Sequence, residues 1–207
     1  MQEEAKDAGR KAQESGGTRS GLLRAAAGLL EEGGMEAVTL RAVGRAAGLS
    51  RQAPYRHFVD KEALLSAVAV GYFERLWEEM AVAAREAGGD PMSRLDAMVE
   101  AYVLFALRNP NRYRLMLGPE MKESLLPEVH AAARSVHEGF VKAVAECQKA
   151  GRLPAGDTVA LAALIGATSH GAVDQALSGH VEATKGQGDP LALVRLLLSH
   201  LRTDERL

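Results

Sequence analysis

Apolar side chains recur at the spacing of an α-helix along most of the chain. The first clear stretch places Leu22, Leu23, Ala26, Leu29 and Leu30 on one helical face, and comparable stretches follow as far as residue 201. No alternation of apolar and polar residues is long enough to indicate a β-strand. Alanine and leucine, the strongest helix formers, are abundant, and runs of β-branched residues are scarce. The sequence therefore predicts an all-α fold.

Glycine and proline mark the places where these helices end. Gly33 and Gly34 end the first helix, and the stretch Gly88-Gly89-Asp90-Pro91 separates two long helices. By residue number, the expected helices are 20–33, 40–47, 51–58, 61–83, 91–108, 112–117, 128–150, 158–177 and 190–201.

Basic residues gather in one short part of an otherwise acidic chain. The whole chain has a formal net charge of −2, yet residues 39–61 contain five basic side chains and one acidic side chain. That segment has a net charge of +4, which leaves −6 on the remainder. The asymmetry indicates a polyanionic partner for one end of the molecule, although a solvated helical face would have the same composition. The charged residues of the segment are Arg41, Arg45, Arg51, Arg56, Asp60 and Lys61.

Two short helices around Gly48 form the layout of a helix-turn-helix. Ala47 and Gly48 are small where two helices would meet, and Leu49 is expected to fill the gap between them. Ser50 and Arg51 then place a hydroxyl and a cation at the start of the third helix. Hydroxyls and backbone N–H groups at helix starts bind phosphate, while arginine and glutamine side chains can read guanine and adenine.

The run TLRAVGRAAGLSRQAPYRHFVDKEALL at residues 39–65 resembles the DNA-binding signature of the TetR family of bacterial regulators, among its AcrR-like members. The turn glycine, the Tyr-x-His-Phe cluster and the Asp-Lys-Glu-x-Leu-Leu continuation carry the resemblance. Ser169-His170-Gly171 is also similar to the Trp-His-Gly motif of one subgroup. This chain departs from that motif because its single tryptophan is Trp77.

The resemblance implies a DNA-binding surface built from the second and third helices and the start of the fourth. Base contacts would come from the beginning of the third helix, and phosphate contacts from the residues around it. The expected members are Thr39, Arg41, Arg51, Gln52, Ala53, Tyr55, Arg56, His57 and Lys61.

The resemblance further implies three regions along the chain. Residues 1–17 would be a disordered tail, residues 18–65 the DNA-binding domain, and residues 66–207 a helical domain for ligand binding and dimerisation. Two late helices would form the apolar seam of a homodimer, through Ala160, Leu164, Ala167, Gly171, Leu193, Leu196 and Leu197. An unidentified small-molecule effector would bind among Trp77, Met98, Tyr102, Phe105, Met116, Phe140 and Val144.

Histidines offer the main alternative to this interpretation. His130 and His137 lie seven residues apart on one helical face, and His170 precedes Asp174 by four residues. Such pairs could serve an enzyme or hold a metal ion, but solvated or hydrogen-bonded histidines are more common. We therefore expect no catalytic residue, no metal and no cofactor.

The expected protein is a cytoplasmic dimeric repressor that a small molecule releases from double-stranded operator DNA. The lone Cys147 excludes an intrachain disulfide, and no apolar run is long enough for a membrane helix. Two alternatives stay open, a small helical enzyme that uses the histidines and a DNA-binding or architectural protein without a switch.

Overall fold

In the computed structural model, residues 2–118, 127–179 and 188–203 are described, with side chains from residue 16 onward. These residues form α-helices and one short 3-10 helix, and no strand occurs among them. The all-α prediction is therefore confirmed. The described chain divides into an N-terminal unit, residues 2–72, 111–118 and 127–130, and a C-terminal unit, residues 73–110, 131–179 and 188–203.

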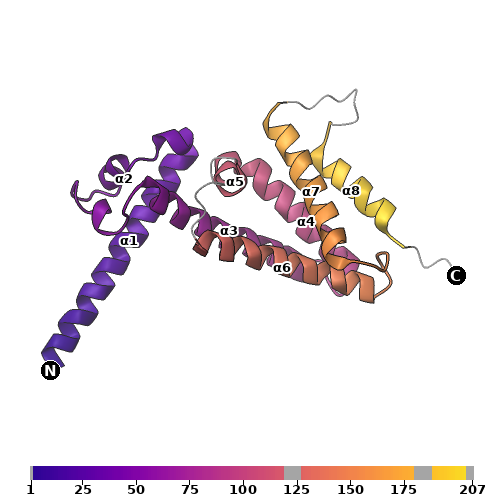
Figure 1. Cartoon of the computed structure of the whole chain (residues 1–207), viewed down its shortest axis with the longest axis horizontal. Helices are drawn as coiled ribbons and strands as arrows, with labels where there is room; N and C mark the ends of the chain where they lie inside the picture. The colour runs from indigo at the N-terminus through magenta and orange to yellow at the C-terminus, as the bar shows by residue number, and fades with distance from the viewer. Residues whose placement is uncertain (1, 119–126, 180–187, 204–207) are drawn as a thin grey trace. The chain divides into compact units, whose positions relative to one another are not determined.

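The N-terminal unit is a cluster of helices around a small apolar core (Figure 1). It contains α1 (Gln2–Ala37), α2 (Leu40–Ala46), the 3-10 helix η1 (Pro54–Arg56), the start of α3 (Lys61–Glu86) and most of α5 (Pro110–Leu117). The apolar positions of the first predicted helix point inward, as helical periodicity requires. Fully buried side chains of this core include Leu22, Ala26, Leu30, Val38, Val43 and Leu64.

Helix α1 is longer than the sequence predicts. Residues 1–17 are predicted from the sequence as a disordered tail, whereas the described residues 2–17 continue α1 toward the N-terminus. Alanine, glutamate, lysine, glutamine and arginine are frequent there, and these residues favour a helix even without an apolar face. The predicted end of the helix is confirmed, since Gly34 takes φ +67° and interrupts the helical path.

Arg112 joins α5 to α1 within the N-terminal unit. The Nε of Arg112 donates to a Glu31 carboxylate oxygen at 2.9 Å, and its guanidinium lies 5.1 Å from the centre of the Tyr72 ring. Asn111 Nδ2 adds a hydrogen bond to the backbone carbonyl of Glu31 at 3.2 Å. The unit therefore includes a segment from beyond the expected boundary at residue 65, held by side-chain contacts that leave no local pattern in the sequence.

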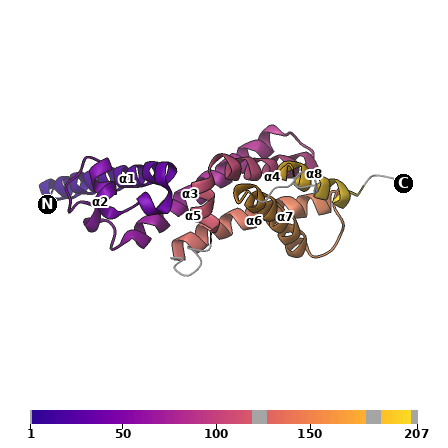
Figure 2. The same ribbon diagram turned by 90° about the horizontal axis from the view of Figure 1, so that it is seen from above.

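The C-terminal unit is a group of packed α-helices (Figures 1 and 2). It contains the rest of α3, α4 (Pro91–Arg108), most of α6 (Pro127–Lys149), α7 (Thr158–Leu177) and α8 (Pro190–Leu201). The predicted bounds of α4, α7 and α8 agree with the structure. Helix α4 packs against both α7 and α8, which also pack against each other.

Aspartate side chains fix the starts of these three helices. Asp90, Asp157 and Asp189 each accept a backbone N–H in the first turn of the following helix at 2.9 Å. Proline follows the aspartate in α4 and α8, at a position where the missing N–H costs little. Hydrogen bonds from Ser93 lower the pKa of the Asp90 carboxyl, so the cap stays ionised at neutral pH.

Helices α3 and α6 approach each other closely at one glycine in the C-terminal unit. The indole ring of Trp77 lies against the backbone of Gly139, and a Cβ atom at position 139 would overlap three carbons of that ring. Because proteins are close-packed, neither helix could accept a larger residue there without moving. Gly139 is thus a packing residue, and its place on an otherwise ordinary helix gives no such signal in the sequence.

We predict that Gly139→Ala lowers the free energy of unfolding by about 1–3 kcal/mol, the usual cost of overpacking a core. Gly71→Ala is the matched control, because Gly71 lies on α3 with open space where the added methyl group would stand. The control should be neutral or stabilise the protein by about 0.5–1 kcal/mol, the gain of alanine over glycine in a helix. Urea unfolding monitored by Trp77 fluorescence measures both, and equal stability of the two variants would contradict the packing described.

Candidate nucleic-acid interface

Thr39 caps α2. Its backbone is extended, and its Oγ1 accepts the backbone N–H of Ala42 at 3.1 Å. The cap orients the first turn of α2, in which Leu40 is buried and Arg41 is exposed. Arg41 therefore projects from the same helix start that Thr39 defines.

The prediction of an α-helix at residues 51–58 is wrong, because turns and a short 3-10 helix form there. Gly48 takes φ +67° in the turn after α2, and the chain then forms successive turns that lead into η1. Ala53 N–H donates to the Ser50 carbonyl at 3.0 Å, and His57 N–H to the Pro54 carbonyl at 3.0 Å, which are both bonds of 3-10 spacing. Pro54 has no N–H to donate to Ser50, so a regular α-helical bond is missing at this point.

Gly44 sets the distance between α2 and η1. The ring of Pro54 is buried against Gly44, and a Cβ atom at position 44 would lie 2.9 Å from Pro54 Cγ. Leu49 is only half-buried, although its N–H donates to the Gly44 carbonyl at 2.9 Å. The gap that the sequence assigns to Leu49 is closed mainly by the proline ring, and Gly44 is the residue that allows it.

The predicted DNA-binding residues lie on and around this α2–η1 pair. Tyr55 is 49% exposed, which is unusual for a large side chain in a small unit. Phe58, three residues later, is only 4% exposed and belongs to the core. Exposed members of the predicted set are Thr39, Arg41, Arg51, Gln52, Tyr55 and Arg56, and half-buried members are Ala53, His57 and Lys61.

The exposed arginines of this surface have no acidic partners. Among the described residues, no carboxylate forms an ion pair with Arg41, Arg51 or Arg56, and all three are exposed. Several arginines elsewhere are paired with acids, as Arg94 is with Glu146 at 3.1 Å. Exposed guanidinium groups without internal acids are suited to bind phosphates.

Two family models match the chain. Residues 22–68 match the one described as "Bacterial regulatory proteins, tetR family", and residues 95–201 match "Tetracyclin repressor-like, C-terminal domain". The chain belongs to the TetR family. It is therefore a DNA-binding transcriptional regulator with a helix-turn-helix and a helical C-terminal domain. Regulators of the TetR family are generally non-enzymatic DNA-binding proteins.

Solved structures have the same fold. A protein of unknown function from Rhodococcus sp. RHA1 is 32% identical with a TM-score of 0.78, covering 89% of this chain and 93% of that one. A TetR-family regulator from Pectobacterium atrosepticum is 25% identical with a TM-score of 0.75, covering 94% and 98%. The uncharacterized HTH-type transcriptional regulator YobS of Bacillus subtilis (strain 168) is 29% identical over 100 residues, 48% of this chain. The match spans about half (51%) of YobS.

The residues predicted for a TetR-family dimer seam lie on α7 and α8. Leu164 and Leu196 are 48% and 55% exposed, and Val159 on α7 is 54% exposed. Of the predicted set, Ala160, Leu164, Ala167 and Leu196 are exposed, and Gly171, Leu193 and Leu197 are half-buried. An apolar face is therefore open to solvent in the single chain.

The residues predicted for the effector pocket are mostly interior. Met116 belongs to the N-terminal unit, while the others belong to the C-terminal unit. A polar pair lies near them, since Tyr102 Oη on α4 is 3.4 Å from His170 Nδ1 on α7. Within their units, Met98, Phe105, Met116 and Val144 are buried, and Trp77, Tyr102 and Phe140 are half-buried.

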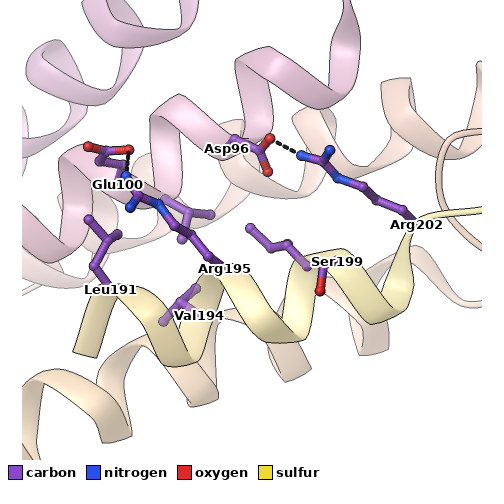
Figure 3. A pocket seen from close by; sticks show the side chains of 9 residues that line it. Asp96, Glu100, Leu191, Val194, Arg195, Ser199 and Arg202 are labelled. Atoms are coloured by element: carbon purple, nitrogen blue, oxygen red, sulfur yellow. Dashed lines mark hydrogen bonds and ion pairs between the residues drawn. The ribbon is translucent and has the colours of Figure 1, made fainter. Parts of the chain in front are cut away.

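A groove of about 360 Å³ lies between α4 and α8, and its lining includes none of the predicted pocket residues (Figure 3). Val99, Val194 and Leu198 supply apolar surface. Ion pairs join the two helices across it, Arg195 with Glu100 at 2.8 Å and Arg202 with Asp96. The charged residues that line the groove all belong to these ion pairs, which link α8 to α4. The groove therefore exposes no unpaired cation or anion.

Features of the enzyme alternative are weak in the structure. His130 and His137 are exposed, and the described residues include no group of three metal-binding side chains. Burial raises the pKa of Cys147 to about 11, which keeps the thiol protonated and unreactive at neutral pH. No helix within the described ranges is long and apolar enough to cross a membrane.

We predict that Gly44→Ala destabilises the helix-turn-helix and weakens DNA binding, since the added methyl group forces η1 away from α2. The free energy of unfolding should fall by about 1–3 kcal/mol. Pro54→Ala removes the opposing Cγ atom, so the Gly44→Ala/Pro54→Ala double variant should recover part of the loss. Urea unfolding of the four proteins in a double-mutant cycle measures the coupling. If the changes in unfolding free energy of the two single variants simply add in the double variant, the added methyl group at position 44 does not clash with Pro54.

Proposed function

We propose that this regulator is a homodimeric repressor that binds a two-fold operator and leaves it when a small molecule binds the C-terminal unit. The observation that best supports the proposal is the set of exposed arginines on the helix-turn-helix without acidic partners. The repressor action, the dimer and the effector response each go beyond family membership and are part of this proposal.

Residues 51–53, at the start of the third predicted helix, are proposed to read bases in the major groove. Arg51 and Gln52 are exposed, and their side chains can form paired hydrogen bonds with guanine and adenine respectively. The Ala53 methyl group suits the methyl group of thymine. Tyr55, His57 and Lys61, with Thr39, Arg41 and Arg56, would bind phosphates and fix the register on the duplex.

We predict that Arg51→Ala and Gln52→Ala reduce discrimination between the operator and unrelated DNA. Each lost base contact should cost about 1–3 kcal/mol of specific binding, because a paired hydrogen bond to a base edge disappears. Fluorescence anisotropy measures the affinity for DNA from upstream of the protein's own gene and for a scrambled duplex. The ratio of the two affinities gives the discrimination. Arg75→Ala, in an exposed ion pair with Glu79 on α3, is the control. Unchanged ratios in both variants would overturn the base-reading assignment.

The exposed face of α7 and α8 is proposed to pair with the same face of a second copy. Helix-turn-helix regulators read two half-sites about one helical turn apart, and this needs a two-fold axis. Apolar residues on two adjacent helices form one contiguous face suited to a four-helix seam. Small residues at 160, 167 and 171 would allow close approach of the partner's helices.

We predict that Leu164→Glu and Leu196→Glu convert the dimer to a monomer, since each would bury carboxylates at a two-fold seam. Val59→Glu is the matched control, because Val59 is 83% exposed but lies in the N-terminal unit. Sedimentation equilibrium measures the mass of each variant. A Leu164→Glu/Leu196→Glu double variant that remains dimeric would place the interface elsewhere.

The effector is proposed to be an apolar or weakly polar small molecule. The predicted lining residues of the C-terminal unit, Trp77, Met98, Tyr102, Phe105, Phe140 and Val144, carry no formal charge. The Tyr102–His170 pair offers a hydrogen-bonding group beside this apolar set. Binding would shift the equilibrium between conformations of the dimer that fit the operator and those that do not. We place this activity in the cytoplasm and assign no enzymatic step to the chain.

A further inference from the structure

Arg19 belongs to α1, but its side chain lies over Phe58, just after η1. Its guanidinium carbon is 5.4 Å from the centre of the Phe58 ring, at cation–π distance. The backbone N–H of Phe58 donates to the Pro54 carbonyl at 2.9 Å, so the residue that carries the ring is bonded to η1. The centre of the His57 ring is 6.5 Å from that of Phe58. Arg19 is thus held next to residues that are expected to touch DNA.

The charge of Arg19 is open to a partner. Arg19 is exposed, and no carboxylate among the described residues forms an ion pair with it. Arg112 of the same unit shows the contrast, since it also lies over an aromatic ring but its charge is matched by Glu31. Stacking on Phe58 limits the conformations of the long Arg19 side chain, so less entropy is lost when it binds an anion.

We propose that Arg19 binds a backbone phosphate of duplex DNA and extends the DNA-binding surface from the helix-turn-helix onto α1. This inference rests on the DNA-binding surface described above and adds a contact that the sequence pattern of residues 39–65 does not include. The contact is to a phosphate, so it contributes to affinity for any sequence and not to the choice of operator.

A purely structural role for Arg19 makes a different prediction. Its side chain could simply cover the edge of Phe58, as long basic side chains often cover apolar surface. In that case loss of Arg19 lowers thermal stability and leaves the salt dependence of DNA binding unchanged. A phosphate contact instead changes the number of counterions released on binding.

The test compares wild type with Arg19→Gln, Arg19→Lys and Arg75→Gln in the full chain. Arg19→Gln keeps part of the stem and removes the charge, Arg19→Lys keeps the charge, and Arg75→Gln removes an exposed charge from the C-terminal unit. Binding to a short duplex of random sequence and to upstream DNA is titrated by anisotropy over a range of salt concentrations. Melting temperatures are measured in parallel to confirm folding.

In the proposed dimer both copies of Arg19 would bind a phosphate, so we expect the slope of log K against log salt to become shallower by about 1.8 in Arg19→Gln, about 0.9 for each protomer, and to stay at the wild-type value in the other two variants. The affinity ratio of wild type to Arg19→Gln should then change about twelvefold between 50 and 200 mM salt, on both duplexes. An unchanged slope in Arg19→Gln, with or without a lower melting temperature, overturns the proposal. If wild type itself binds neither duplex, the DNA-binding function fails as well, which separates the two failures.

Discussion

The close approach of Gly44 to the Pro54 ring is the constraint on which the DNA-binding surface depends. It holds η1 against α2 at a distance that no other residue at position 44 would allow. From that contact, Thr39 and Arg41 face outward at one end of α2, and Arg51, Tyr55 and Arg56 face outward around η1. Polar and basic side chains are thus presented to solvent by an apolar contact beneath them, and the family's function requires that arrangement.

Electrostatics divides the molecule into two kinds of surface. In the C-terminal unit, Arg94, Arg195 and Arg202 form ion pairs with acids on other helices, where they help to hold the packing. On the helix-turn-helix the described arginines have no such partners, so their charge is available to an external polyanion. Surface ion pairs contribute little to stability, whereas several unpaired cations on one face contribute strongly to phosphate binding. The acidic remainder of the chain would keep DNA on this face.

Local patterns predicted most of the helices and the family of the protein. Glycine and proline indicated where α4 and α8 begin, and the run at residues 39–65 indicated the family. Contacts between residues far apart in the sequence were not predictable. Arg112 brings α5 into the N-terminal unit, Trp77 requires glycine at 139, and Arg19 stacks on Phe58. The α-helix expected at 51–58 failed because Pro54 removes a donor where the pattern of side chains is still helical.

Hydroxyl-radical footprinting of the full chain on DNA from upstream of its own gene tests the central claim most directly. A dimer whose two helix-turn-helix surfaces bind phosphates and bases should protect two related patches, about 10 base pairs apart from centre to centre, on one face of the duplex. The patches should be related by a two-fold axis and should fade together as salt rises. A single unsymmetrical patch, or uniform protection without periodicity, would contradict the account.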